Sequence, residues 1–414
     1  MRKLSTTLGA LSLVAMMAFD QGKTVAQSTV REIDSPAGPS SGEPNLFTAP
    51  DGRVFLSWIE AVANGRHSLR FSIRDGQRWS EPRTISEGSD WSVNWANFPS
   101  LIVAADGSLV AHWLVKAGSD SHASYINIAR STDQGKTWGK PFMPHRDNTT
   151  TEHGFVSMLP LGRAEVGALW LDGRQFGKAS KANEHSAHPP SSNEMTLRWA
   201  VIGKNGELAE EALLDARVCD CCQTSAALTS EGPVVVYRDR SPEEVRDISI
   251  IRLVKGRWTE PRTVHADGWH IQGCPVNGPS IAADGRRVAV SWFTAARDSQ
   301  RVNIAFSTDA GASFAQPVKV DEGSPVGRVD VRMLGDGSAL VCWLERTSKG
   351  GEIKARRVRA DGSRDQSRGI AVADVARATG FPRMTRAGDD VIFAWTDSSS
   401  PSRVRVSTLS LRGN

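Results

Sequence analysis

Short apolar stretches recur along the chain, and tight polar turns separate them. The stretch 99–102, for example, is followed by Asp106 and Gly107 and then by a second apolar stretch, 109–113. Short alternating runs that are broken at Asp-Gly predict β-hairpins rather than helices. The 37 glycines and 13 tryptophans of the sequence fit the same all-β prediction.

The second apolar stretch of each unit carries an aromatic residue near its end. These aromatic markers follow one another at intervals of 51 to 67 residues: Trp58, Trp113, Trp170, Tyr237, Trp292, Trp343 and Trp395. Near-equal intervals of this size are typical of β-propeller blades with four strands each. The sequence therefore predicts an all-β propeller of seven blades, or of six if one unit is an insertion.

The last unit, from Phe381, runs out after three predicted strands. Residues 29–33 resemble the fourth strands of other units, such as 82–85. We therefore expect the mature N-terminal strand to complete the last blade, which closes the ring and removes its open edges.

The first residues are typical of a secretion signal. Arg2 and Lys3 precede an apolar run over 8–19, and small residues follow at 24–26. This pattern predicts a signal peptide at 1–26 and a single propeller domain at 28–414. The mature protein is expected in the periplasm or outside the cell, as a monomer without a membrane span. A net charge of only +4 gives no reason to expect nucleic acid as a partner.

Two predicted turns share the pattern Ser-x-Asp-x-Gly-x-Ser/Thr-aromatic. Their defining residues are Ser131, Asp133, Gly135 and Trp138 in the first, and Ser307, Asp309, Gly311 and Phe314 in the second. In such a turn the Asp accepts backbone N–H groups and the Gly adopts a positive φ. The pattern resembles the Asp box, or BNR repeat, of the sialidase (neuraminidase) superfamily. The resemblance implies a propeller in which these boxes are structural and lie on the face opposite the active site.

The same resemblance implies a catalytic set of three arginines, a tyrosine–glutamate pair and an aspartic acid. The Phe/Tyr-Arg-Ile-Pro motif of that family is absent here, and the chain has only two tyrosines, Tyr125 and Tyr237. Asp239 and Asp172 are the candidates for a general acid, and Tyr237 is the candidate nucleophile of a sialidase-like glycoside hydrolase. Tyr237 also occupies an aromatic marker position, which favours a packing role, so whether the protein is an enzyme stays open.

In a propeller, the loops that follow the second and fourth strands of each blade leave on one common face. Arginines gather in these loops, and a guanidinium binds a carboxylate through paired hydrogen bonds. The candidates for binding an anionic glycan are Arg174, Arg238, Arg240, Arg246, Arg297, Arg328, Trp269 and Asn277. The alternative is that arginines pair with acids next to them in sequence: Arg238 with Asp239, Arg246 with Asp247, Arg297 with Asp298, and Arg328 with Asp330.

Four cysteines fall in two successive loops of that face: Cys219, Cys221, Cys222 and Cys274. Export favours two disulfides. Thiolates with His270 or His153 could instead bind copper or zinc, and a redox-active pair is a third explanation. Two alternatives to a glycan function therefore remain: a metal or redox centre, and a scaffold for interactions without catalysis.

Overall fold

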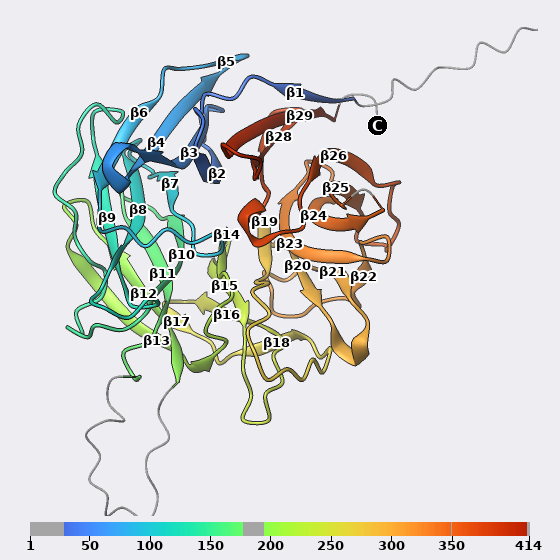
Figure 1. The fold of residues 1–414 in the computed structure, drawn as a ribbon. Coiled ribbons are helices and arrows are strands. Elements are labelled where there is room, and N and C mark those ends of the chain that lie inside the picture. The colour runs from blue at the N-terminus through green and yellow to red at the C-terminus, as the bar shows by residue number, and fades with distance from the viewer. Residues whose placement is uncertain (1–28, 177–193, 349, 412–414) are drawn as a thin grey trace, which may run out of the picture.

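The computed structural model describes residues 29–176, 194–348 and 350–411, so the predicted signal peptide at 1–26 lies outside the described residues. Within the described parts the chain forms seven antiparallel sheets arranged around an axis (Figure 1). The prediction of seven blades is thus confirmed. No helix in the described parts has the length and apolar character needed to cross a membrane.

Each blade places its first strand innermost and its later strands progressively outward. The first strands of blades 1 to 7 are β2 (Ser41–Thr48), β7 (Ser100–Val103), β10 (His153–Pro160), β14 (Ser225–Thr229), β19 (Ser280–Asp284), β23 (Pro325–Met333) and β27 (Arg383–Ala387). The second strands are β3 (Val54–Val62), β8 (Leu109–Lys116), β11 (Val166–Asp172), β15 (Gly232–Arg238), β20 (Arg287–Thr294), β24 (Ala339–Thr347) and β28 (Asp390–Asp397).

The outer strands follow in the same order. The third strands are β4 (Arg66–Asp75), β9 (Ser124–Ser131), β12 (Met195–Ile202), β16 (Ile248–Val254), β21 (Arg301–Ser307), β25 (Gly350–Val358) and β29 (Arg403–Ser410). The outermost are β6 (Arg83–Gly88), β13 (Leu208–Val218), β18 (Arg262–His265), β22 (Val318–Lys319), β26 (Arg368–Ala373) and β1 (Val30–Ile33), with two short additions, β5 (Arg78–Trp79) and β17 (Arg257–Trp258). In blade 2 a single bridge between Ile128 and Phe142 takes the place of a fourth strand.

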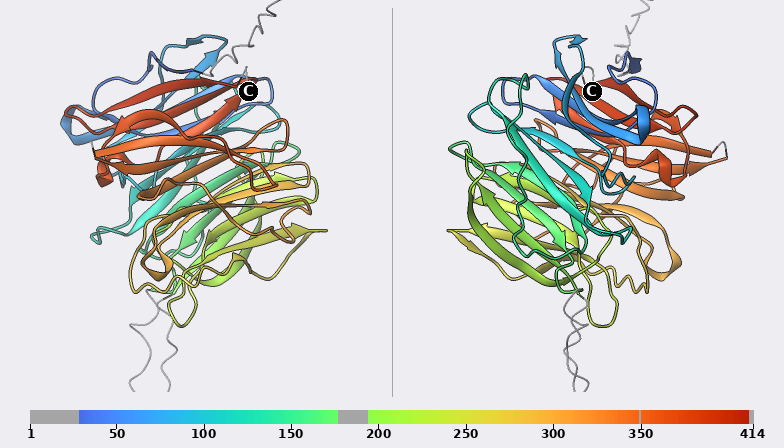
Figure 2. Two further views of the ribbon diagram at one scale, coloured as in Figure 1. Left: turned by 90° about the vertical axis from the view of Figure 1, so that its right-hand side faces the viewer. Right: turned by 60° about the vertical axis from the view of Figure 1, so that its left-hand side comes forward.

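The two ends of the described chain meet in blade 7, as the sequence predicts. β1 pairs antiparallel with β29, with Val30 opposite Leu409 and Ile33 opposite Val406. In the side views of Figure 2 the blue and red ends of the chain lie together, and the yellow-green blades are on the far side of the ring. Pairing of the first strand with the last closes the ring.

Aromatic and branched residues of the second strands fill the space between the blades. Trp58, Trp170, Trp292 and Trp343 are among the largest fully buried side chains. Their strands are apolar on both faces because each sheet packs against a neighbour on either side. Burial of a large side chain of this kind stabilises the fold by about 1.5–3 kcal/mol.

Both Asp boxes have the expected local structure. Asp133 accepts hydrogen bonds from the backbone N–H groups of Lys136 and Thr137, at 3.0 and 2.9 Å. Gly135 has φ +78°, and a Cβ atom there would lie 2.3 Å from the Phe71 ring. Asp309 accepts the backbone N–H of Ser313 at 2.9 Å in the equivalent turn of blade 5. These turns belong to the scaffold, as the resemblance implies.

Candidate functional site

The acid two residues after an aromatic marker accepts the indole N–H of that marker in three blades. The pairs are Trp58 with Glu60 at 3.1 Å, Trp170 with Asp172 at 2.8 Å, and Trp343 with Glu345 at 2.5 Å. A buried indole N–H needs such an acceptor. Asp172 is fully buried. Each of its carboxylate oxygens also accepts one N–H group of the Arg174 guanidinium, at 2.7 Å. Its visible contacts are thus structural, and its predicted catalytic role stays a prediction.

Blade 4 departs from this pattern. Tyr237 donates its hydroxyl to Asp215 at 2.5 Å and leaves Asp239 to other partners. Asp239 accepts the Ser249 hydroxyl at 2.8 Å and the Arg240 N–H at 2.7 Å. Burial, reinforced by the negative charge of Asp215, raises the pKa of Asp239. A carboxyl with a raised pKa is suited to general acid chemistry, so the surroundings of Asp239 fit its predicted role, which also stays a prediction.

Two of the predicted binding arginines are buried against backbone carbonyls. Arg238 donates to the carbonyl oxygens of Asn277, Arg246 and Phe293, and its guanidinium lies 4.8 Å from the centre of the Trp269 ring. Arg328 donates to carbonyls at 375, 376 and 380. The Asn277 side chain accepts the Arg328 N–H at 2.7 Å. These residues connect neighbouring blades.

The remaining arginines differ in their surroundings. Arg174 pairs with Asp172 and Glu211, Arg240 pairs with Glu244 and Glu194, and Arg246 pairs with Glu244 and Asp220. Arg297 is exposed. The neighbour pairing considered from the sequence is wrong for Arg238, Arg246 and Arg328. Closure of the ring supplies Arg238 and Arg328 with partners from other segments. Arg246 pairs with Glu244, two residues before it, and with Asp220. The acid proposed for Arg328, Asp330, instead pairs with Arg332 at 2.8 Å.

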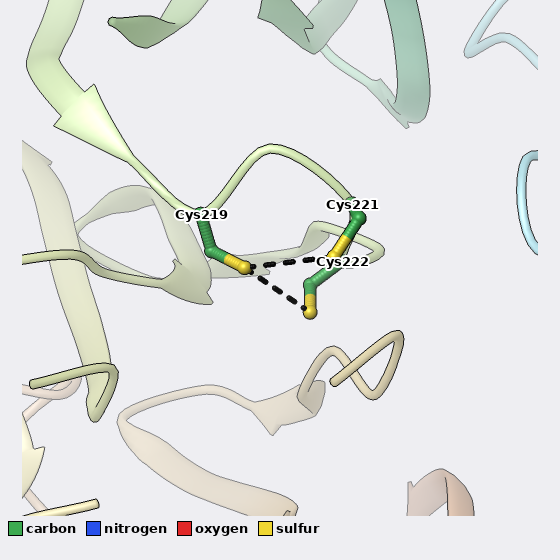
Figure 3. A group of neighbouring side chains, drawn as sticks. All are labelled: Cys219, Cys221 and Cys222. Carbon is green, nitrogen blue, oxygen red and sulfur yellow. Dashed lines mark hydrogen bonds between the residues drawn. The ribbon is translucent and has the colours of Figure 1, made fainter. Parts of the chain in front are cut away.

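The structure brings the four predicted cysteines together, and Figure 3 shows three of them, Cys219, Cys221 and Cys222. The Cys219 sulfur lies 3.8 Å from that of Cys221 and 3.6 Å from that of Cys222. Cys274 lies beside Cys221 on the exposed side. Contacts with the Cys221 and Cys222 thiols hold the pKa of Cys219 well below its usual value. His270 is exposed and is not part of this group.

All five cysteines of the chain lie in its described part, and each has a free thiol there. The free thiols do not decide between the disulfide, metal and redox explanations, and all three remain predictions.

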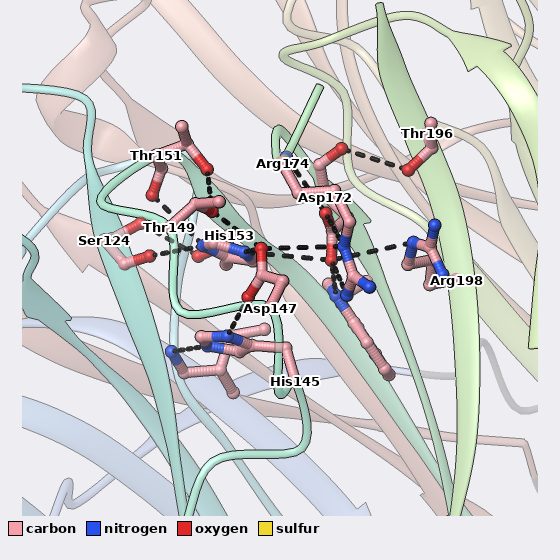
Figure 4. A network of polar contacts seen from close by, with 12 residues as sticks. Ser124, His145, Asp147, Thr149, Thr151, His153, Asp172, Arg174, Thr196 and Arg198 are labelled. Atoms are coloured by element: carbon pink, nitrogen blue, oxygen red, sulfur yellow. Dashed lines mark hydrogen bonds and ion pairs between the residues drawn. The ribbon is translucent and has the colours of Figure 1, made fainter. Parts of the chain in front are cut away.

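A buried network between blades 2 and 3 was not recognised from the sequence (Figure 4). His145 and His153 stack with ring centres 3.9 Å apart, and Asp147 bridges them at 3.2 and 3.0 Å. The His145 Nε2 accepts the Ile126 N–H, so its proton resides on Nδ1. The loop position of Asp147 and His153 was visible in the sequence, but their distance from His145 depends on the fold.

The surroundings of His153 favour its imidazolium form. Its Nδ1 faces the carbonyls of Ser124 and Thr151 at 3.1 Å each, and its Nε2 faces Asp147. All of these partners are acceptors, so both ring nitrogens carry protons. Burial lowers the pKa of His153, but the Asp147 hydrogen bond and the charge of Asp172 outweigh burial and raise it.

A cavity of about 340 Å³ runs along the propeller axis, and all seven first strands contribute to its wall. We call it the axial cavity. Asp330, Arg332 and Arg383 line it. Arg332 pairs with Asp330, and Arg383 lies 3.9 Å from the same carboxylate. The Nε of Arg383 is buried without a hydrogen-bond partner among the described residues. A signal was present in the sequence, since charged residues alternate with valines in this first strand: Arg328, Asp330 and Arg332.

The fold and the Asp boxes define the class as a seven-bladed, sialidase-like propeller. No protein-family model matches the chain, and no curated protein matches its sequence.

Solved structures that resemble the chain include polysaccharide lyase Uly1, with 8% identity, 95% of this chain and 94% of that chain covered, and a TM-score of 0.53. They also include a mutant of NanB sialidase from Streptococcus pneumoniae, with 13% identity, 96% and 70% covered, and a TM-score of 0.43. Trypanosoma rangeli sialidase matches with 10% identity, 81% and 57% covered, and a TM-score of 0.47. At these identities the likeness concerns the fold alone.

Proposed function

We propose that this protein is an exported propeller that binds an anionic sugar in the axial cavity, with Arg383 and Arg332 holding the carboxylate of the sugar. The observation that carries this proposal is the pair of guanidinium groups of Arg332 and Arg383 in the wall of the axial cavity, where the Nε of Arg383 lies 3.9 Å from Asp330 but has no hydrogen-bonded acceptor among the described residues. Two guanidinium groups share the single carboxylate of Asp330, so the site has an excess of positive charge. A ligand carboxylate would supply the missing acceptor.

The size and lining of the axial cavity suit a small sugar. Ligand pockets have volumes of about 300–1000 Å³, and this cavity lies at the lower end of that range. Phe98 and Phe381 provide apolar surface, whereas Ser157, Thr224 and Ser280 provide hydroxyl groups. Solved structures with a similar overall course include sialidases and a polysaccharide lyase, which by their names act on glycans.

The lining favours binding over hydrolysis. Canonical glycoside hydrolysis uses two carboxyl groups, about 5–10 Å apart, on either side of the scissile bond. Asp330 is the one carboxylate among the described residues that line the axial cavity, and it is already paired with Arg332. The catalytic candidates Asp239, Asp172 and Tyr237 are not part of that lining.

Arg383→Met is expected to weaken binding of glucuronate or N-acetylneuraminate by about 30-fold. It removes the guanidinium group that would donate charge-assisted hydrogen bonds to the carboxylate of the sugar. Isothermal titration calorimetry on the mature protein measures this change, with glucose as the uncharged control sugar. Arg297→Met, at an exposed arginine outside the cavity, should bind like the wild type. Equal affinities of Arg383→Met and wild type, with both proteins folded by circular dichroism, would refute the proposed site.

Export is the second part of the proposal. Protein recovered from the periplasm or the medium is expected to begin at Gln27, and N-terminal sequencing tests this. Leu13→Arg places a charge in the apolar run of the signal and should retain the uncleaved chain inside the cell. A mature protein that still begins at Met1 would contradict the proposed cleavage.

A further inference from the structure

The sulfur atoms of Cys219, Cys221 and Cys222 have the spacing of metal ligands. All three lie within 4.8 Å of one another, and two of their separations are 3.6 and 3.8 Å. Thiolates at about 2.3 Å from a metal have their sulfur atoms about 3.8 Å apart in tetrahedral coordination and about 4.0 Å apart in trigonal coordination. A disulfide needs about 2.05 Å. The observed separations therefore match coordination without further movement of the loop.

The loop that carries these sulfur atoms is fixed by neighbouring blades. The Cys219 N–H donates to the Arg238 carbonyl at 3.1 Å, directly after β13 ends. Immediately after Cys222, the Gln223 side chain donates to the Ala96 carbonyl at 2.7 Å and accepts the Gly278 N–H at 3.1 Å. A ligand loop held at both ends loses little conformational entropy when it binds a cation.

A buried cation lies beside the sulfur atoms. Arg246 Nη1 is 3.3 Å from the Cys219 sulfur, and its side chain is 5% exposed. Glu244 holds this guanidinium in place at 2.8 Å. Three thiolates around a monovalent cation leave a net negative charge, and Arg246 is positioned to offset part of it.

Cys274 offers a fourth sulfur at the exposed side of the group. Its sulfur, that of Cys221 and a carboxylate oxygen of Asp220 lie within 4.8 Å of one another. Cys274 comes from the loop that enters blade 5, whereas the other three cysteines come from the loop that enters blade 4. An exposed ligand next to three more buried ones gives an incoming ion a point of entry.

We propose that Cys219, Cys221 and Cys222 bind one copper(I) ion, with Cys274 as the entry ligand at the exposed side. Copper(I) is the best match because it is soft and accepts three thiolates, whereas a structural zinc ion almost always takes four ligands. This site is separate from the axial cavity, because none of the four cysteines lines that cavity.

The test is metal loading of the reduced mature protein without oxygen, with copper(I) supplied from a chromogenic chelator. We expect one copper(I) per chain, with sulfur-to-copper charge-transfer absorption. Cys221→Ser should weaken binding by at least about 100-fold, because Cys221 lies close both to the two buried cysteines, Cys219 and Cys222, and to the entry ligand Cys274. Cys342→Ala is the matched control, since this thiol is buried in β24 of blade 6, and it should bind copper(I) like the wild type.

Three results would overturn the proposal. The first is failure of the reduced wild-type protein to bind copper(I). The second is equal affinity in the folded Cys221→Ser variant. The third is obtained on protein isolated directly from the periplasm or the medium. It is an intact mass that shows two disulfides among the four cysteines, together with no metal by elemental analysis. A zinc(II) arm of the same titration tests the choice of metal, and stoichiometric zinc without copper would overturn the assignment to copper.

Discussion

Arg238→Met is expected to destabilise the folded protein by about 4 kcal/mol, because it leaves buried carbonyl groups without donors. Arg238 is 2% exposed and donates four hydrogen bonds to three carbonyl oxygens. One carbonyl belongs to Phe293 in β20 and another to Asn277 before β19, so the guanidinium joins blade 4 to blade 5. Urea unfolding, followed by tryptophan fluorescence, measures the change.

Arg297→Met is the control for this prediction. Arg297 is exposed and follows the second strand of the next blade, so its replacement should change the free energy of unfolding by less than about 0.5 kcal/mol. If Arg238 were held in place only to receive a ligand, Arg238→Met would have near wild-type stability and a defect in binding alone. That result would contradict the structural role.

The fold could be predicted from the sequence because its determinants are local and repeated. The aromatic markers occur in the second strand of every blade, and the Asp boxes form within one hairpin each. The pairing of β1 with β29, which closes the ring, could also be predicted, because residues 29–33 resemble the outer strands of other blades. Each of these signals needs only a few consecutive residues.

The site was predictable only as far as loop topology determines it. The rule that certain loops share one face places Cys274 beside Cys221, and the structure confirms this. The same rule does not identify the hydrogen-bond partners. Arg238 donates to backbone carbonyl oxygens. Every residue has such an oxygen, so the sequence does not indicate which ones Arg238 will contact. Tyr237 donates its hydroxyl to Asp215 in another strand, whereas the pattern in other blades would pair it with Asp239, the acid two residues after it.

Arg332 and Arg383 were missed for a related reason. The sequence predicts functional residues mainly in loops, but both arginines lie in first strands, which line the axis. A charged residue in an inner strand is costly unless it is paired or serves a ligand. Such a residue in the first strand of a propeller repeat is therefore a better signal of a functional site than an arginine in a polar loop.

His153→Gln is expected to cost about 3 kcal/mol of stability at pH 6, because it removes the positive charge held between Asp147 and Asp172. Arg174 remains beside both carboxylates in the variant, which keeps the loss from being larger. Chemical unfolding of wild type and variant at a series of pH values measures the difference in stability.

The pH dependence of that difference is the sharper test. The pKa of His153 is raised in the folded protein, so its contribution is fully present below the unfolded value of about 6.5 and declines as the pH rises through the folded value. His145, whose pKa is lowered by burial and also by the charge of His153, makes the opposite contribution, and loss of the His153 charge in the variant reduces that contribution and makes the trend shallower. The cost of His153→Gln should therefore shrink between pH 6 and pH 9. His122→Gln, at an exposed histidine, is the matched control and should have near wild-type stability. A cost that stays constant or grows with pH would show that His153 is neutral in the fold.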